Sequence, residues 1–112
     1  MAKNIIYEKS YIFALRVVKL SKYLKQELKE FILSRQVLRS GTSIGALERE
    51  EQFAQSRADF IHKLQVVLKE ANETDYWINI LYDSDYLNKK MYDSLVTDIK
   101  EIISLLVSIV KS

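Results

Sequence analysis

Proline and cysteine are absent from this sequence of 112 residues, and glycine occurs only twice. Without cysteine the chain has neither a disulfide framework nor thiolate chemistry, which is compatible with a reducing compartment. Without proline, and without a Gly/Ser-rich linker, nothing marks a domain boundary. We therefore expect a single domain over residues 1–112, long enough to bury about two-thirds of its unfolded surface.

Long hydrophobic runs are also missing. The most apolar segment, IISLLVSIV at residues 102–110, spans nine residues and includes two serines, far short of the ~20 residues that cross a bilayer. The first ten residues, MAKNIIYEKS, lack the apolar core of a signal peptide. We expect a soluble, cytoplasmic protein with no membrane partner.

Side chains that carry out chemistry are scarce. The one histidine, His62, has only Asp59 at the Glu-x-x-His spacing that di-iron bundles use on two helices. A surface histidine beside a helix-capping aspartate is the preferred interpretation, so no metal site is expected. Phosphate-binding glycine loops of the GxGxxG or GxxxxGK[ST] kind are missing. We predict no enzyme activity, no catalytic residue and no cofactor.

What the sequence does have is helical periodicity, in four segments that begin near residues 5, 34, 57 and 88. Ser34 is the expected N-cap of the second segment, and Ser56 with Asp59 resembles a capping box before the third. The third segment has the clearest apolar row, which consists of Phe60, Leu64, Val67, Ala71, Thr74, Ile78 and Leu81. Short connections near 25–33, 54–56 and 83–88 favour an all-α, antiparallel up-down-up-down four-helix bundle.

Both glycines lie inside the second helical segment, in the stretch RSGTSIGALE at residues 39–48. Each costs about 1 kcal/mol relative to alanine in a helix. Gly41, Gly45 and Ser34 form a strip roughly 100° from the centre of the apolar face. Because small residues let a neighbouring backbone come close, we expect dispersion contacts there to offset the lost propensity. A backbone bend or a close approach to a ligand is the alternative.

The net charge of +2 is unevenly spread. Residues 1–25 have a local balance of +5, and the rest of the chain has a balance of −3. This asymmetry indicates a polyanion or an acidic partner. The basic residues of the first 25 are Lys3, Lys9, Arg16, Lys19, Lys22 and Lys25. We predict that Lys9, Arg16, Lys19 and Lys22 contact the phosphates of RNA or DNA; a solvated helix face is the alternative.

The third segment has apolar residues outside its core row. Val66, Trp77 and Ile80 lie opposite the row, and an exposed strip with the only tryptophan of the chain is typical of an interface. Arg39 in the second segment could pair with an acidic side chain such as Glu73 across that contact, or it could bind phosphate together with the basic residues of the first segment. We therefore predict a homo-oligomer whose subunits meet through these residues. The alternative is that the third helix is wrapped more fully by its own neighbours.

Three stretches carry a family resemblance: VLRSGTSIGA at 37–46, SRADFIHKL at 56–64 and LKEANETDYW at 68–77. They resemble the four-helix-bundle proteins encoded within intervening sequences of bacterial 23S ribosomal RNA genes, sometimes named as ribosomal proteins. The likeness extends from about Tyr7 to Val107. It implies a bundle that assembles into a homopentameric ring, with no established biochemical activity for most members and no enzyme among them. The family is also similar to the accessory variability protein of diversity-generating retroelements, a basic pentamer that binds a reverse transcriptase and nucleic acid.

One position departs from the family pattern. Many members have Asn directly after the Gly-Ala step, where this sequence has Leu47, so a role that rests on that amide does not carry over. The matching positions are Arg39, Ser43, Gly45, Ala46, Glu50, Asp59, Phe60, Leu64, Glu73, Thr74 and Trp77. The resulting hypothesis is a non-enzymatic, homo-oligomeric bundle, pentameric as the resemblance implies, that binds nucleic acid or a nucleic-acid-processing partner. A protein-interaction scaffold without nucleic-acid binding is the alternative.

Overall fold

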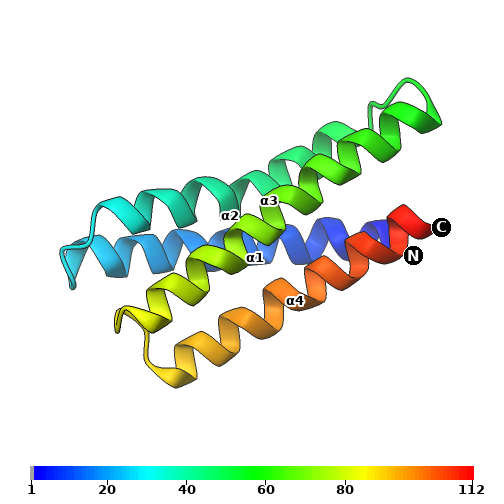
Figure 1. The fold of residues 1–112 in the computed structure, drawn as a ribbon. Coiled ribbons are helices and arrows are strands. Elements are labelled where there is room, and N and C mark those ends of the chain that lie inside the picture. Colours follow the sequence, from blue (N-terminus) through cyan, green and yellow to red (C-terminus); the bar gives the residue numbers. More distant parts are fainter. Residues whose placement is uncertain (1) are drawn as a thin grey trace.

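The computed structural model describes the backbone of residues 2–112 and the side chains of residues 5–112, so the Lys3 side chain lies outside the described part. The fold consists of four helices: α1 (Ala2–Gln26), α2 (Ile32–Glu51), α3 (Arg57–Asp83) and α4 (Lys89–Lys111). Each helix runs antiparallel to the one before it, and α4 packs back against α1 (Figure 1). The predicted up-down-up-down four-helix bundle is confirmed. It measures 45 × 21 × 19 Å.

Apolar rows on the helices form the core, among them the row predicted for the third segment. In α3 every member of the row from Leu64 to Leu81 is buried, and Phe60 packs against it while partly exposed. Similar rows are buried on the two helices α1 and α4. On α1 the buried residues include Phe13, Val17, Leu20 and Leu24, and on α4 they are Leu95, Ile99, Ile102, Leu106 and Ile109. Burying one such side chain fully stabilises a fold by ~1.5–3 kcal/mol. These rows, more than helix propensity, therefore hold the bundle together.

Side chains cap the first turns of α3 and α4. The Ser56 hydroxyl accepts a hydrogen bond from the N–H of Asp59 at 3.1 Å, as predicted. The Asp59 carboxylate accepts one from the N–H of Gln55 at 3.1 Å, one residue before the position that a capping box uses. This hydrogen bond lowers the pKa of Asp59. At the start of α4, Asn88 accepts a hydrogen bond from the N–H of Met91 at 2.8 Å.

The start of α2 differs from the prediction that Ser34 is its N-cap. The helix begins at Ile32, and the N-cap position is held by Phe31, whose side chain accepts no hydrogen bond. Glu30 takes the capping role, because its Oε1 accepts a hydrogen bond from the N–H of Ser34 at 2.9 Å. Ser34 is buried, and the hydroxyl of Ser21 on α1 donates to its carbonyl oxygen at 3.5 Å. A glutamate reaching back from the connection thus replaces the expected serine cap.

Close packing of α1 against α2 explains the two glycines. Gly41 is buried, and a Cβ atom added to it would lie 2.8 Å from Cγ2 and 2.9 Å from Cγ1 of Val17. A Cβ atom added to Gly45 would lie 3.5 Å from the carbonyl oxygen of Ser10. Ser34, also facing α1, extends the strip. The prediction of a small-residue strip against a neighbouring helix is confirmed, and α2 is continuous through both glycines.

Gly41→Ala should destabilise the protein by about 1–3 kcal/mol, although alanine has the better helix propensity. The added methyl group would overlap Val17, whose branched side chain has little rotamer freedom in a helix. Gly45→Ala is the matched control, because its Cβ would make ordinary van der Waals contacts; we expect no loss, or a gain of up to about 1 kcal/mol. Urea unfolding followed by circular dichroism measures both, and equal effects would contradict the tight approach at Gly41.

Candidate interaction surfaces

The four predicted phosphate contacts on α1 fall into two groups. Lys9 forms an ion pair with Glu101 on α4, and its hydrogen bond to that carboxylate raises the pKa of Lys9. Arg16 forms an ion pair with Asp98, and its Nη2 donates to the Ser94 hydroxyl at 2.8 Å. Both cations are therefore engaged with α4 in the folded chain.

Lys19 and Lys22 form the second group, and both are exposed. No ion pair joins either of them to another residue in the part of the chain with described side chains. Lys19 also borders a shallow groove of about 330 Å³ between α1 and α4, whose apolar wall includes Leu20, Tyr23 and Leu95. Of the four predicted residues, these two are free to meet phosphate.

Arg39 and Glu73, predicted to pair across a subunit contact, pair within one chain. Arg39 on α2 forms an ion pair with Glu73 on α3, and its Nη1 donates to Glu70 Oε1 at 3.1 Å. Trp77 Nε1 donates to Glu73 Oε2 at 3.0 Å, and the Ser43 hydroxyl donates to Glu70 Oε1 at 3.0 Å. The network joins α2 to α3. A contact between subunits would have to use Arg39 and Glu73 as a preformed pair, and that role stays a prediction.

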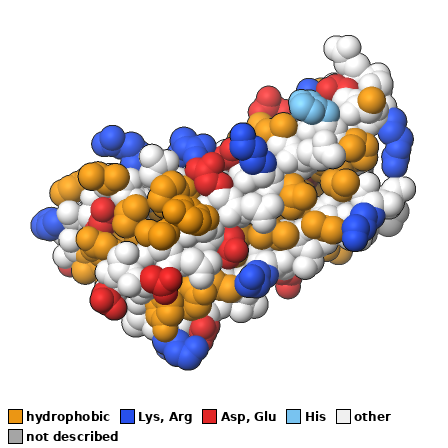
Figure 2. All heavy atoms as spheres, in the orientation of Figure 1, with side chains coloured by type: hydrophobic (Ala, Val, Ile, Leu, Met, Phe, Trp, Pro, Cys, Tyr) orange, Lys and Arg blue, Asp and Glu red, His pale blue; other side chains and the backbone are white. Residues whose placement is uncertain are grey.

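The apolar strip of α3 is less exposed than the sequence predicts. Trp77 packs against the core, with the Tyr76 ring edge-on at 5.1 Å between centroids. Val66 and Ile80 are half-buried. The predicted exposed strip is only partly exposed, because α2 and α4 flank α3 on both sides, as the alternative of fuller wrapping by neighbouring helices had it. Apolar side chains still gather on this side of the bundle, toward the α3–α4 connection (Figure 2), and a subunit contact through Val66, Trp77 and Ile80 stays a prediction.

Most of the exposed apolar side chains lie on α1 and in the connection after it, outside the predicted subunit interface. Ile5, Tyr11, Ile12 and Leu15 are 43%, 56%, 49% and 51% exposed. Of the ten large apolar side chains exposed in the described part of the chain, eight lie between residues 5 and 32. A helix that is apolar on all sides is normally buried on all sides. The signal was present in the sequence, because Ile12 and Leu15 stand where an amphipathic helix has polar residues.

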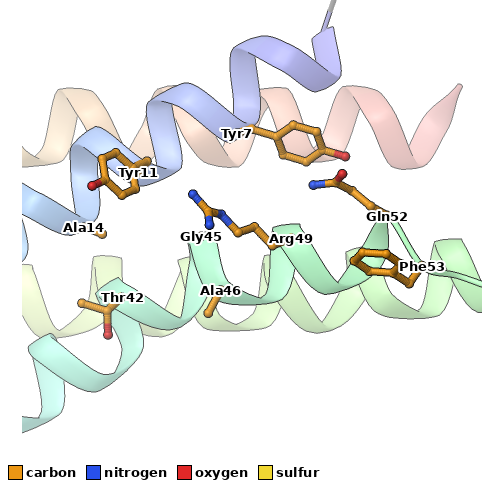
Figure 3. Close-up of a pocket in the computed structure, with 9 residues that line it drawn as sticks. All are labelled: Tyr7, Tyr11, Ala14, Thr42, Gly45, Ala46, Arg49, Gln52 and Phe53. Atoms are coloured by element: carbon orange, nitrogen blue, oxygen red, sulfur yellow. The ribbon is translucent and has the colours of Figure 1, made fainter.

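A groove runs between α1 and α2 beside this exposed surface (Figure 3). Its volume is about 690 Å³. The Arg49 guanidinium extends into it and lies 5.9 Å from the centroid of the Tyr11 ring, and Phe53 is 80% exposed just beyond α2. The lining residues are Tyr7, Tyr11, Ala14, Thr42, Gly45, Ala46, Arg49, Gln52 and Phe53. Small residues along the floor allow close approach, while the aromatic rings offer apolar contact.

Two glutamates near the end of α2, Glu48 and Glu51, are each only 1% exposed. The Tyr7 hydroxyl donates a hydrogen bond to Glu51 Oε1 at 2.6 Å and so links α1 to the end of α2. Burial, this hydrogen bond and the charges of the two carboxylates raise the pKa of Tyr7 well above its ordinary value. Neither glutamate is among the predicted site residues, although their spacing of four and seven residues from buried Ile44 places them on the inner face.

Among the side chains that the structure describes, no three His, Cys, Asp or Glu residues come together in a group that could hold a metal ion. His62 is exposed on α3, and its neighbour Asp59 pairs with Lys63 at 3.3 Å. Within residues 2–112, no helix is long and apolar enough to cross a membrane.

Comparison with known proteins supports the resemblance seen in the sequence. The model of the 23S rRNA-intervening sequence protein family matches residues 2–108. The chain is also similar to a protein of unknown function from the S23 ribosomal protein family of Bacteroides thetaiotaomicron VPI-5482, known from a crystal structure. The two are 53% identical and superpose with a TM-score of 0.98, over 100% of each chain. No curated protein matches the sequence.

Tyr7→Phe should lower the free energy of unfolding at pH 8 by about 1–3 kcal/mol, because it leaves the buried Glu51 carboxylate without its donor. The raised pKa of Tyr7 also predicts a pH dependence. Above pH 10 the unfolded chain loses the Tyr7 proton while the folded chain keeps it, so this contribution falls by about 1.4 kcal/mol per pH unit. The difference between wild type and variant should therefore shrink as the pH rises above 10.

Urea unfolding at pH 8 and pH 11, at one protein concentration, measures this difference. Tyr23→Phe is the control, because Tyr23 is exposed on the same helix and should change neither the stability nor its pH dependence. A Tyr7→Phe variant as stable as wild type at pH 8 would contradict the assigned hydrogen bond.

Proposed function

Because the chain belongs to the 23S rRNA-intervening sequence protein family, we propose that it is a non-enzymatic helical bundle that assembles with copies of itself and binds nucleic acid, or a nucleic-acid-processing partner, through basic surface. One observation carries the proposal. The outer face of α1 is apolar over its first half, at Ile12 and Leu15, and basic over its second half, at Lys19 and Lys22.

The apolar half of α1 supports self-assembly. Exposed apolar surface of this extent on one helix marks a contact with another molecule, and a chain that carries such a surface in every copy can cover it with a second copy. The subunit number of five rests on the family resemblance alone. The half-buried strip of α3 at Val66, Trp77 and Ile80 is a second surface that an assembly could cover.

The basic half of α1 supports nucleic-acid binding. Lys19 and Lys22 are exposed, and Lys25 and Lys29 follow them toward the α1–α2 connection. Each copy in an assembly repeats these lysines, so their charges add up over one surface, and neutralised phosphates release counterions. Lys9 and Arg16 contribute less than the sequence suggests, because phosphate would have to displace Glu101 and Asp98 from them.

The pairing of Lys9 and Arg16 also favours the second candidate, a protein-interaction scaffold. If half of the predicted basic stripe serves to attach α4, the remaining lysines can act simply as solvated side chains. The scaffold shares the assembly through α1 and differs only in lacking a nucleic-acid ligand. A salt titration therefore separates the two candidates.

Light scattering should show that the 13.1 kDa chain forms a multimer at micromolar concentration. Leu15→Glu should shift the mass toward the monomer without unfolding the bundle, because it places a charge in a desolvated contact at a position that is exposed in the single chain. Ser104→Glu adds the same charge to an exposed position of α4 and should leave the mass unchanged. A wild-type protein that stays monomeric would contradict the proposed assembly.

Binding to single-stranded RNA should weaken steeply with salt. The double variant Lys19→Gln, Lys22→Gln should reduce the slope of log K against log salt by about 1.4 per chain, since each lost phosphate contact removes about 0.7. Lys90→Gln with Lys100→Gln removes two exposed lysines from α4 and should leave the slope nearly unchanged. The absence of measurable RNA or DNA binding at low salt would remove this part of the proposal and leave the scaffold.

A further inference from the structure

We infer that the outer strip of α1 in one copy sits in the groove between α1 and α2 of the next copy, so that neighbouring subunits meet through two different surfaces. The strip consists of Ile5, Glu8, Ile12 and Leu15. This inference rests on the proposed self-assembly and adds to it the two surfaces and their pairing.

The strip has the shape of a ridge. Its residues are spaced 3-4-3 along α1, so their side chains lie in one row on the side away from the core. Ile5, Ile12 and Leu15 are each between 43% and 51% exposed. Rows of this spacing form the ridges that pack into grooves on other helices.

The groove has the shape and chemistry to receive that ridge. Its floor contains Ala14, Gly45 and Ala46, which keep side-chain bulk away from an incoming helix, and the rings of Tyr11 and Phe53 border it (Figure 3). A helix that lies along this groove can bury its side chains against both α1 and α2. The apolar side chains of the ridge would replace water against these rings.

Charge is complementary as well. Glu8 lies in the middle of the ridge and Arg49 in the groove, and neither forms an ion pair with any residue whose side chain the structure describes. The guanidinium of Arg49 contacts the Tyr11 ring, which leaves its N–H donors available to a carboxylate. Seating the ridge brings these two opposite charges together across the contact.

Ridge and groove also lie at the same level along the bundle. Ile12 on the ridge and Tyr11 in the groove are consecutive residues, which point about 100° apart around the helix. Copies related by rotation about an axis parallel to the bundle stay at the same level, so the ridge of each can reach the groove of the next. Such a heterologous contact closes into a ring when the rotation allows it.

The absence of cysteine from the sequence makes cross-linking a direct test. The double variant Ile12→Cys, Ala46→Cys, oxidised with copper phenanthroline, should give a ladder of dimers, trimers and larger species on a non-reducing gel. Each single variant alone should give none, and a mixture of the two should give dimers only. Lys22→Cys with Ala46→Cys is the control, because residue 22 lies beyond the ridge, and should give no ladder.

Three results would overturn the inference. A double variant that stops at dimers indicates a two-fold contact, a single variant that dimerises indicates that like surfaces meet, and the absence of cross-links places the contact elsewhere. If light scattering still shows a multimer in these cases, the self-assembly holds and only the ridge-and-groove contact fails. A monomeric wild-type protein would contradict both the self-assembly and the ridge-and-groove contact.

A charge exchange provides the second measurement. Glu8→Arg and Arg49→Glu should each raise the protein concentration at half-assembly by roughly tenfold or more, because like charges then face one another. The combined variant should return close to the wild-type value, which simple destabilisation of the fold would not do. If the combined variant instead weakens assembly by the sum of the two single effects, the pairing of Glu8 with Arg49 is contradicted.

Discussion

Helix α1 carries more apolar surface than its own bundle can cover. Its inner row, with Phe13 and Val17, is buried in the core, while Ile12 and Leu15 repeat the helical spacing on the opposite side and stay exposed. One four-helix bundle cannot bury both rows, because only α2 and α4 pack directly beside α1. The proposed assembly, its groove and the placement of the basic surface all depend on this excess.

The same small residues that let α1 and α2 pack closely also shape the groove beside them. At Gly41 the missing Cβ admits the branched side chain of Val17, and the two helices come close. One turn further, Gly45 and Ala46 leave the surface above that contact unfilled. A helix pair held together by larger residues would project them into this space. The two glycines lower the helix propensity of α2, but their small size allows both the close α1–α2 contact in the core and the open groove at the surface.

The sequence predicted the fold well and the surfaces less well, for a physical reason. Burial rows such as Leu64 to Leu81, and caps such as Ser56, depend on spacing within one segment, which a sequence shows directly. Exposure depends on which flanks the neighbouring helices cover. Trp77 was expected outside and packs against the core, whereas the outward row of α1 was not recognised, because a helical wheel carries no information about the neighbours of a helix.

Which charged side chains pair with each other is even harder to predict from the sequence than which side chains are exposed. Arg16 and Asp98 are 82 residues apart in the sequence, and only the register of α1 against α4 shows that they pair. The +5 balance of residues 1–25 is therefore partly balanced inside the bundle by acids counted in the other part of the chain. Exposed ion pairs of this kind contribute only ~0–1 kcal/mol each, so they hold the bundle together weakly while removing two cations from the accessible surface. Positive charge is left toward the α1–α2 connection, at Lys19 and Lys22, so the proposed binding of a polyanion depends mainly on these two residues.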